Sequence, residues 1–452
     1  MNRMRLLALV VIAALANCSP PSTPMSSLPS ARSRSQPEPL SGAASPIQHV
    51  VIIVQENRTT NNLFNGFPGA GTVRVGKNSH NRTVQLEPLP LSAPYDINHA
   101  HSTFEIEWAN GKMNGWNLAQ SRCKKRHTCP RPGVRAYGYV PEKEVEPYFI
   151  MARRYTFGAN MFQTNQGPSF PAHQYILSGT STISDGSNLR AAENPLTPQK
   201  KSTGGCDSLK GSLVTLIDQN EIENRKTYPC FDRNSLIALV EAKSLTWHYY
   251  QAGRGPGVWK GPDAILRVFQ SPQFATDVVS PPARVLDDVK NGNLANVVWV
   301  TPTAAASDHA GSTDGSGPSW VASIVNAIGV SQYWNNTAIL VTWDDWGGWF
   351  DPVPPPQYNS YELSFRVPLL VISAYAKQHY ISHVQHEFGS LLKFTEDMFG
   401  LGSLGTTDVR ADDLSDCFDF SHGPNKFVPI PAPHDAEYFL HQPVGGTPDD
   451  DF

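Results

Sequence analysis

Two adjacent carboxylates, Asp344 and Asp345, directly follow an apolar, β-type run in this 452-residue sequence. The run covers residues 337–343, and glycines, tryptophans and a proline stop come after the two acids. In α/β proteins, metal ligands are often presented where a buried strand ends at the carboxyl edge of a sheet. Neighbouring carboxylates repel each other unless a cation lies beside them. The pair therefore indicates a metal site, although a lone Asp-Asp is also typical of a polar turn.

Further polar clusters lie at the ends of other apolar stretches, and they are Glu56-Asn57, Ser169 and Asp308-His309. Together with the two aspartates, the first of these clusters offers three carboxylates and one amide oxygen. A serine hydroxyl would complete a hard, oxygen-rich set of ligands. Such a set suits Ca²⁺, Mg²⁺ or Mn²⁺ better than Zn²⁺.

These residue types could carry out phosphoryl chemistry. A divalent cation beside Ser169 would lower the pKa of its hydroxyl and would neutralise charge on a bound phosphoryl group. Three histidines are candidates to hydrogen-bond phosphate oxygens or to protonate a leaving oxygen, namely His99, His101 and His309. His173, four residues after Ser169, is expected to be a neighbour of the site rather than a ligand.

Each cluster also has an ordinary structural explanation. Glu56-Asn57 could form a strand-end turn, Ser169 could cap the helix that follows it, and Asp308-His309 could form an Asx turn. The tryptophans at positions 343, 346 and 349 suit packing or the rim of a pocket. The metal hypothesis therefore depends on these clusters meeting at one edge of a sheet.

Apolar runs alternate with helical patterns along most of the chain. Strands are predicted at residues 49–55, 296–301, 338–343 and 367–373, and helices at 172–177, 319–328 and 387–399. This alternation predicts an α/β fold with a mostly parallel central sheet flanked by helices. The segments 73–114, 189–228 and 253–282 are rich in Gly, Pro, Ser and Asn, and we expect them to form large, irregular loop insertions.

The first 18 residues have the features of an export signal. Arg3 and Arg5 precede an apolar run that is too short to span a bilayer as a mature helix. Residues 15–18 resemble a bacterial lipobox, so that Cys18 is acylated or leaves with an ordinary signal, and an uncleaved anchor is a third alternative. The protein would then be periplasmic, anchored to the outer membrane, or secreted. We expect a Pro/Ser-rich linker at 19–45, a catalytic domain at 46–420 and a peripheral tail at 421–452.

Charge and cysteine content limit the class of protein. The formal net charge of −4 shows no electrostatic footprint of a nucleic-acid binder. Apart from Cys18, the simplest disulfides in an exported chain are Cys123–Cys129 and Cys206–Cys230, which leave Cys417 free. No Cys-x-x-Cys doublet occurs, so a zinc site built from thiolates is not expected.

The chain resembles the bacterial phosphoesterase family of secreted phospholipases C and a class of acid phosphatases, within the alkaline phosphatase-like superfamily. The resemblance covers residues 48–420 and is carried by segments such as IQHVVIIVQENRTTNNLFNGFPGA, GPSFPAHQYILSGT and YWNNTAILVTWDDWGGWFDPVPPP. It implies a parallel-rich sheet between helices, with the site at the carboxyl ends of the strands. Ser169 matches the nucleophile, which in this family also contacts the metal. The implied metal ligands are Glu56, Asn57, Asp344 and Asp345. His101 and His99 match the family's histidine segment upstream of Gly-Lys-Met, and Asp308 and His309 match its phosphate-side pair.

The chain departs from many members of this family at two places. Thr59-Thr60-Asn61 stands where they have Ser-Phe-Asp, and Pro352 follows Asp351 where they have a histidine. Because the metal set is intact, the resemblance implies hydrolysis, while the two departures leave the substrate preference open.

Three functions are compatible with these residues. An exported phospholipase C-like phosphodiesterase is favoured, and exposed aromatic loops around Trp346 and Trp349 together with a lipid tether at Cys18 would suit it. Its partners would be a phosphate ester, including a phospholipid, and no nucleic acid. An acid phosphatase acting on phosphomonoesters is the alternative, and a catalytically silent surface-binding lipoprotein is the third.

Overall fold

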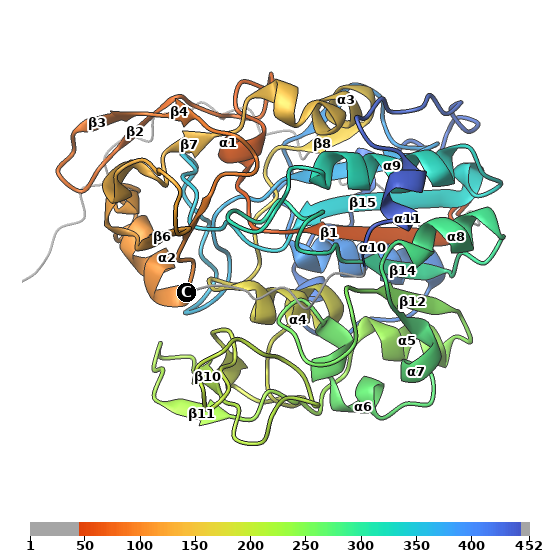
Figure 1. The fold of residues 1–452 in the computed structure, drawn as a ribbon. Helices are drawn as coiled ribbons and strands as arrows, with labels where there is room; N and C mark the ends of the chain where they lie inside the picture. The colour runs from red at the N-terminus through yellow and green to blue at the C-terminus, as the bar shows by residue number, and fades with distance from the viewer. Residues whose placement is uncertain (1–44, 444–452) are drawn as a thin grey trace, which may run out of the picture. The chain divides into compact units, whose positions relative to one another are not determined.

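An eight-stranded sheet forms the centre of the structure, a computed structural model that describes residues 45–443 (Figure 1). Its strands lie in the order β13 (Val278–Val279), β12 (Trp247–Tyr250), β14 (Val297–Val300), β1 (His49–Gln55), β15 (Thr337–Trp343), β16 (Leu369–Ser373), β8 (Thr156–Gly158) and β17 (Tyr380–Ser382). Neighbouring strands are parallel except where β16 meets β15 and β8. The predicted α/β fold with a mostly parallel sheet is confirmed. The predicted signal at 1–18, the linker as far as residue 44 and the last nine residues lie outside the described residues.

The two central strands bring the predicted ligands together. β1 and β15 are rich in Val, Ile and Thr, residue types that favour extended chain, and both strands are almost completely buried. They run parallel from the pair His49 and Thr337 to the pair Gln55 and Trp343. Both strands therefore end at the same level, and the polar residues that follow them emerge side by side.

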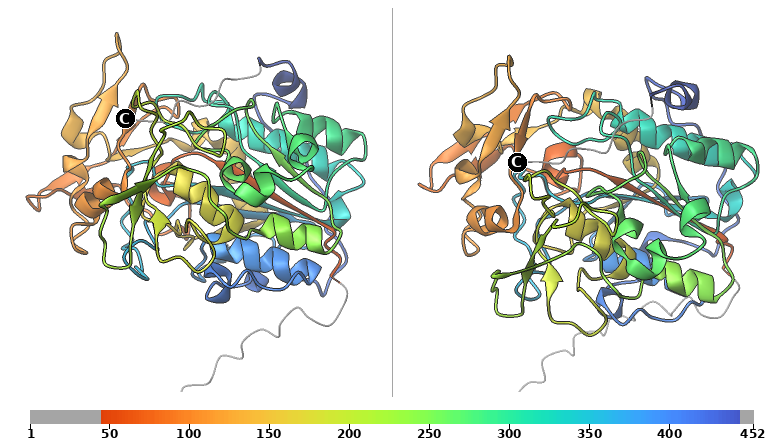
Figure 2. Two further views of the ribbon diagram at one scale, coloured as in Figure 1. Left: turned by 90° about the horizontal axis from the view of Figure 1, so that it is seen from below. Right: turned by 60° about the horizontal axis from the view of Figure 1, so that its bottom comes forward.

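Helices cover both faces of the sheet, as Figure 2 shows from two directions. One layer contains α3 (Glu146–Arg154), α8 (Arg284–Lys290), α9 (Gly317–Gly329) and α11 (Ala436–Leu440). The other contains α4 (Ser169–Ser178), α5 (Leu236–Ala242) and α10 (Phe388–Phe399). The helices predicted at 172–177, 319–328 and 387–399 correspond to α4, α9 and α10.

The segments predicted to be irregular contain more regular structure than the sequence indicated. Residues 73–114 include β2 (Val75–Lys77), β3 (Thr83–Gln85), β4 (Glu87–Pro88), β5 (Tyr95–Ile97) and α2 (His101–Trp108). Residues 189–228 form a small sheet of β9 (Arg190–Ala191), β10 (Val214–Ile217) and β11 (Arg225–Thr227), and residues 253–282 include α6 (Leu266–Phe269) and α7 (Phe274–Asp277). These strands are too short to show a period. The buried side of α2 is largely polar, so no apolar stripe marks it in the sequence.

The tryptophans after β15 are buried, and the expected exposed aromatic loop is wrong. Trp346 and Trp349 have no exposed surface and belong to a second hydrophobic core together with Phe104 and Trp116. The indole Nε1 of Trp346 donates a hydrogen bond to Glu107 Oε2 over 2.6 Å. Because these rings tie the segment after β15 to α2, they stabilise the site instead of meeting a lipid surface.

The cysteine pairing is as predicted. Cys123–Cys129 and Cys206–Cys230 form disulfides, and Cys417 is a free, buried thiol. Cys123 ends β6 (Ser121–Cys123), beyond the first insertion, and the second bridge joins Cys206 in the insertion at 189–228 to Cys230 just after it.

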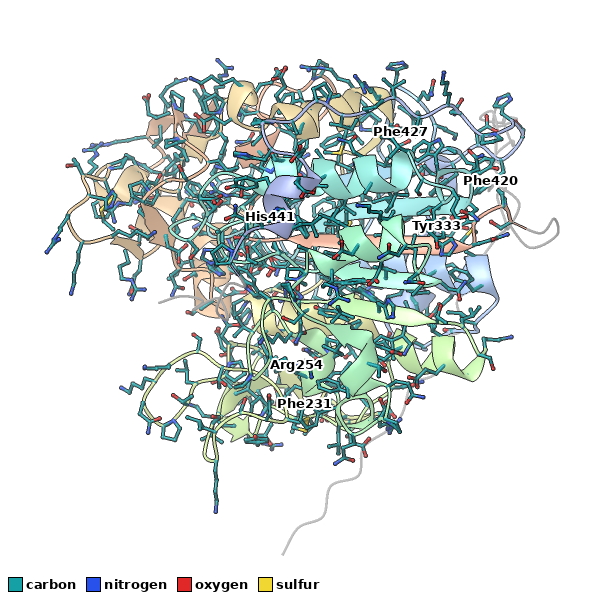
Figure 3. All side chains as sticks on the ribbon, turned by 45° about the vertical axis from the view of Figure 1, so that its right-hand side comes forward. Phe231, Arg254, Tyr333, Phe420, Phe427 and His441 are labelled. Atoms are coloured by element: carbon teal, nitrogen blue, oxygen red, sulfur yellow. A yellow bond between two sulfur atoms is a disulfide. The ribbon has the colours of Figure 1, made fainter. Side chains whose placement is uncertain are left out.

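The described part of the tail packs against the catalytic core. Phe427, labelled in Figure 3, lies against the ring of Trp334, with the two ring centroids 4.8 Å apart. Ile430 and Phe439 are also buried in the main core. Within residues 45–443, no helix combines the length and the apolar character needed to cross a bilayer.

A buried ion pair fixes the segment that follows the site. Arg366 donates hydrogen bonds to both carboxylate oxygens of Asp351, over 2.9 and 3.1 Å, and also to three backbone carbonyls. Removal of one partner leaves a buried, uncompensated charge.

We expect Arg366→Met to lower the free energy of unfolding by about 3–5 kcal/mol in urea titrations. Arg153→Met breaks an exposed pair with Glu142 and is expected to cost less than about 1 kcal/mol. Equal losses in the two variants would contradict the assignment.

Candidate active site

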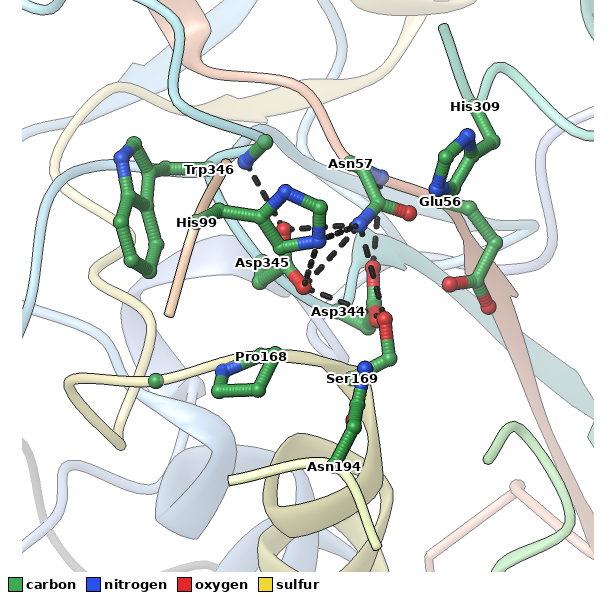
Figure 4. A network of polar contacts seen from close by, with 12 residues as sticks. Glu56, Asn57, His99, Pro168, Ser169, Asn194, His309, Asp344, Asp345 and Trp346 are labelled. Atoms are coloured by element: carbon green, nitrogen blue, oxygen red, sulfur yellow. Dashed lines mark hydrogen bonds and ion pairs between the residues drawn. The ribbon is translucent and has the colours of Figure 1, made fainter. Parts of the chain in front are cut away.

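The residues that follow β1 and β15 form one polar cluster, drawn in Figure 4. The backbone N–H of Asn57 donates to Asp344 Oδ1 over 3.2 Å, and the N–H of Asp344 donates to the carbonyl of Gln55 over 3.0 Å. Asn57 adopts a left-handed backbone with φ of +63°, a conformation that asparagine tolerates better than most residues. The strand ends thus turn toward each other and bring an amide and two carboxylates into one buried space.

A glycine after the acids allows this close approach. Gly347 has φ of +61°, and its N–H donates to Asp345 Oδ1 over 2.8 Å. A methyl group at this position would lie 2.3 Å from the carbonyl oxygen of Asn57. Only glycine fits here, so the Trp-Gly-Gly sequence is needed to hold Asp345 against the end of β1.

Ser169 contacts the acids from α4, which belongs to the helical layer that also contains α5 and α10. It is the first residue of α4, and Pro168 occupies the capping position, so Ser169 does not cap the helix. Its hydroxyl donates to Asp345 Oδ2 over 3.2 Å and lies 3.5 Å from Asn57 Nδ2. Ser169 is fully buried. The amino-terminal end of a helix favours negative charge, and so suits an alkoxide or a bound phosphoryl oxygen.

The Asn57 amide is oriented by two neighbours. Its Nδ2 lies 3.0 and 3.1 Å from the two oxygens of Asp345 and 3.0 Å from His99 Nε2. His99 Nδ1 lies 2.8 Å from the carbonyl of Ile97, so that Nδ1 donates and Nε2 accepts. The amide oxygen Oδ1 of Asn57 is left buried without a hydrogen-bond partner. An orphaned acceptor of this kind is suited to a cation.

The carboxylates of Glu56 and Asp344 also fit a cation. Glu56 and Asp344 are fully buried, and Asp344 Oδ2 accepts no hydrogen bond. Burial raises the pKa of Asp344, and contacts with Glu56 and Ser169 oppose that rise. His173 adds an imidazole, with Nε2 3.1 Å from Glu56 Oε1, and burial lowers the pKa of His173 to about 3. Donor atoms of Glu56, His173 and Asp344 all lie within 4.8 Å of one another.

Two of the predicted phosphate-side residues lie near this cluster in different ways. His309 lies with its ring centroid 6.1 Å from that of His99, and its Nδ1 is 2.7 Å from the carbonyl of Ala310. The carboxylate of Asp308 instead accepts hydrogen bonds from Tyr148 and Trp343, over 2.8 and 2.9 Å. Burial raises the pKa of Asp308 to about 6. These contacts make Asp308 an anchor for the segment that carries His309.

The structure separates the two upstream histidines. His99 contacts Asn57 directly, whereas His101 begins α2 and hydrogen-bonds to Glu223. Burial disfavours the charged form of His101, but the hydrogen bond and charge of Glu223 outweigh it and raise its pKa. The histidine brought to Ser169 and its neighbours is therefore His99.

Asn61, the last residue of the altered segment Thr59-Thr60-Asn61, makes two structural hydrogen bonds. The side-chain Oδ1 of Asn61 accepts from the N–H of Val73 over 2.7 Å, and the N–H of Asn61 donates to Asp351 Oδ2 over 3.1 Å. Asn61 thus packs beside the buried ion pair of Asp351 and Arg366. This departure from the family pattern alters the support of the site and leaves the ligand cluster itself unchanged.

A cavity of about 510 Å³ adjoins the cluster and shares His99 and Pro168 with it. It is also lined by the half-exposed Leu196 and Leu213 and by the lysines at 200 and 226. Asn194, another lining residue, accepts the N–H of Phe170 over 2.9 Å and so completes the start of α4. The sequence did not single out Asn194, because it lies in an insertion without a recognisable pattern.

Comparison with known proteins identifies the family. The model of the Phosphoesterase family matches residues 47–402, and the chain therefore belongs to this family, as the sequence predicted. Hemolytic phospholipase C of Pseudomonas aeruginosa is 22% identical, over a match that covers 85% of this chain and 57% of that protein. Phospholipase C A of Mycobacterium tuberculosis is 21% identical, over a match that covers 86% of this chain and 81% of that protein.

The chain thus spans little more than half the length of the Pseudomonas relative. Among solved structures, an alkaline phosphatase superfamily protein from Vibrio parahaemolyticus matches 82% of this chain and 70% of its own, with a TM-score of 0.36 and 10% identity. A similarity at that level carries no argument about the site.

The role of Gly347 can be separated from ordinary backbone strain. Gly400 has almost the same φ, +59°, but a methyl group there would meet nothing within 4 Å. We expect Gly400→Ala to lower the free energy of unfolding by about 1–2 kcal/mol, the cost of a left-handed alanine. Gly347→Ala should cost more and also weaken divalent-cation binding, because the methyl group displaces Asn57. Urea unfolding and calorimetric titration measure both effects. Identical behaviour of the two variants would show that the close approach is unimportant.

Proposed function

We propose that this chain is a metal-dependent phosphoesterase in which Ser169 attacks the phosphorus of a phosphate ester. The observation that carries the proposal is the position of the Ser169 hydroxyl at the start of α4, 3.2 Å from Asp345 Oδ2 and beside buried acceptors that fit a cation. Membership of the Phosphoesterase family and the similarity to named phospholipases C support the reaction class.

The residues suggest a two-step displacement. Asp345 Oδ2 already accepts the Ser169 hydrogen bond and is positioned to take its proton. The Oγ–P bond then forms, the P–O bond to the ester alcohol breaks, and the alcohol oxygen gains a proton. Attack by water on the phosphoseryl group releases the phosphate product and restores the serine hydroxyl.

A divalent cation, when bound, would lower the pKa of the serine hydroxyl and neutralise phosphoryl charge. The residues that would hold it are Glu56, Asn57, Ser169, Asp344 and Asp345. Burying three carboxylates together without a compensating charge would be costly. For that reason, a catalytically silent lipoprotein is the least suitable of the three functions considered.

We expect His99 and His309 to have different roles in the reaction. His99 accepts from Asn57 Nδ2, and this contact helps to fix the orientation of the Asn57 amide. His309 is fixed through Nδ1 by the carbonyl of Ala310, and its Nε2 is the ring atom suited to exchange a proton with the leaving oxygen.

A phosphodiester is the favoured substrate. The adjoining cavity offers half-exposed leucines and two lysines, which suit an ester that carries both apolar and anionic groups. Hydrolysis of a phospholipid head group is therefore favoured over that of a simple phosphomonoester. Export, and a membrane tether through Cys18, belong to the same proposal.

Replacement of the nucleophile has a matched control on the same helix. Ser178, nine residues after Ser169, is also buried and its hydroxyl has no hydrogen-bond partner. We expect Ser169→Ala to lower the turnover of a chromogenic phosphate ester by at least about 10³-fold, as removal of a nucleophile does. Ser178→Ala should keep turnover within about twofold. Circular dichroism checks that both variants fold. Retained activity in folded Ser169→Ala would remove Ser169 from the proposed role.

A panel of model esters separates the functions. We expect bis-p-nitrophenyl phosphate to be cleaved with a higher kcat/KM than p-nitrophenyl phosphate, because the cavity can hold the second ester group. Chelation should suppress both reactions, and added divalent ions should restore them. Faster cleavage of the monoester would favour the acid phosphatase alternative, and full activity after chelation would contradict metal dependence.

A further inference from the structure

His173 lies against two acids of the cluster, Glu56 and Asp344. It is one turn after Ser169 on α4, so both side chains lie on the same face of the helix. The imidazole is buried, and its Nε2 is 3.1 Å from Glu56 Oε1 and 3.8 Å from Asp344 Oδ2.

The second ring nitrogen indicates where the proton of His173 lies. His173 Nδ1 is 3.4 Å from the hydroxyl of Tyr249, and that hydroxyl donates to the carbonyl of Trp259 over 3.0 Å. A phenol has one hydrogen to donate. If Tyr249 gives it to Trp259, the phenol oxygen can only accept from His173, whose Nδ1 then carries the hydrogen. The Nε2 atom of the neutral ring then presents a lone pair toward the two carboxylates.

A lone pair facing two acids is unfavourable unless a cation lies between them. The same space is bordered by the unpaired Oδ2 of Asp344 and the unpaired Oδ1 of Asn57. The competing arrangement has the proton on Nε2, donated to Glu56, which would make His173 a partner of that acid and not of a cation. The two arrangements differ in whether His173 touches the metal.

We propose that His173 Nε2 is itself a ligand of the divalent cation, completing a mixed nitrogen and oxygen set with Glu56 and Asp344. Tyr249 fixes the tautomer that makes this possible, as partners of metal-bound histidines commonly do. An oxygen-only set favours Ca²⁺, Mg²⁺ or Mn²⁺, whereas an added imidazole shifts selectivity toward transition ions such as Zn²⁺, Fe²⁺ and Mn²⁺. This inference rests on the proposed metal-dependent function and specifies the class of ion.

The test compares metal-free, full-length wild type with His173→Gln and with a control, His49→Gln. His49 is a half-buried histidine at the opposite end of β1, where it contacts the carbonyl of Ala295. Pulsed electron paramagnetic resonance of the Mn²⁺-loaded proteins detects ¹⁴N bound to the ion, and competition titrations give affinities for Zn²⁺ and Mg²⁺.

We expect His173→Gln to weaken or lose the nitrogen coupling and to bind Zn²⁺ about 100-fold less tightly, with less than about tenfold change for Mg²⁺. His49→Gln should match the wild type. If wild type binds the ion and His173→Gln keeps the same nitrogen coupling and affinities, the inference is overturned while the proposed function stands. If wild type binds no divalent ion at all, the proposed metal-dependent function fails as well.

If His173→Gln does not fold, Tyr249→Phe tests whether His173 binds the cation. Tyr249→Phe keeps the ring and removes the hydroxyl that holds Nδ1. We expect it to weaken Zn²⁺ binding by about 10–100-fold. Unchanged Zn²⁺ affinity in folded Tyr249→Phe would overturn the inference.

Discussion

Three carboxylates are buried at the ends of β1 and β15, and the rest of the site is arranged around their charge. Glu56, Asp344 and Asp345 have no exposed surface. Removing ionised carboxylates from water costs several kcal/mol each unless partners of opposite charge or good hydrogen-bond donors replace the water. Asn57, Ser169 and the N–H of Gly347 supply part of that compensation, but acceptors remain without donors. A cation would satisfy the unpaired Oδ2 of Asp344 and Oδ1 of Asn57. This requirement would explain why a serine hydroxyl, an amide and an imidazole all converge on one buried space.

The surrounding insertions act as supports for this space. The tryptophans after β15 pack into a second core with α2, and a buried arginine holds the segment that follows them. The loop that carries His309 is anchored in the same manner, since the carboxylate of Asp308 is held by Tyr148 and Trp343. Catalytic side chains on loops need such fixed neighbours if they are to keep their geometry. The insertion around β9, β10 and β11 has a different role, because it lines the cavity in which an ester group would lie.

Much of this arrangement could be predicted from the sequence. The two strand ends were visible because runs of β-branched residues stop at polar residues, and parallel strands in one sheet present those residues at one edge. The choice between His99 and His101 was not visible, because it depends on where α2 begins in a segment without an apolar period. The burial of Trp346 and Trp349 depends on α2. Because the inner face of α2 is largely polar, no pattern in the sequence predicts that this helix packs against the two tryptophans. The closeness of His173 to Glu56 follows from helical spacing after Ser169, but the contact with Tyr249 joins distant segments and needed the fold.

The central claim is that one divalent cation binds among Glu56, Asn57, Asp344 and Asp345, next to Ser169. Anomalous diffraction from crystals of the full chain grown with Mn²⁺ tests it most directly. The account predicts a strong peak about 2.0–2.4 Å from oxygens of these residues. Absence of a peak there, or a peak only at the separate group of His386, Asp416 and Cys417, would contradict it.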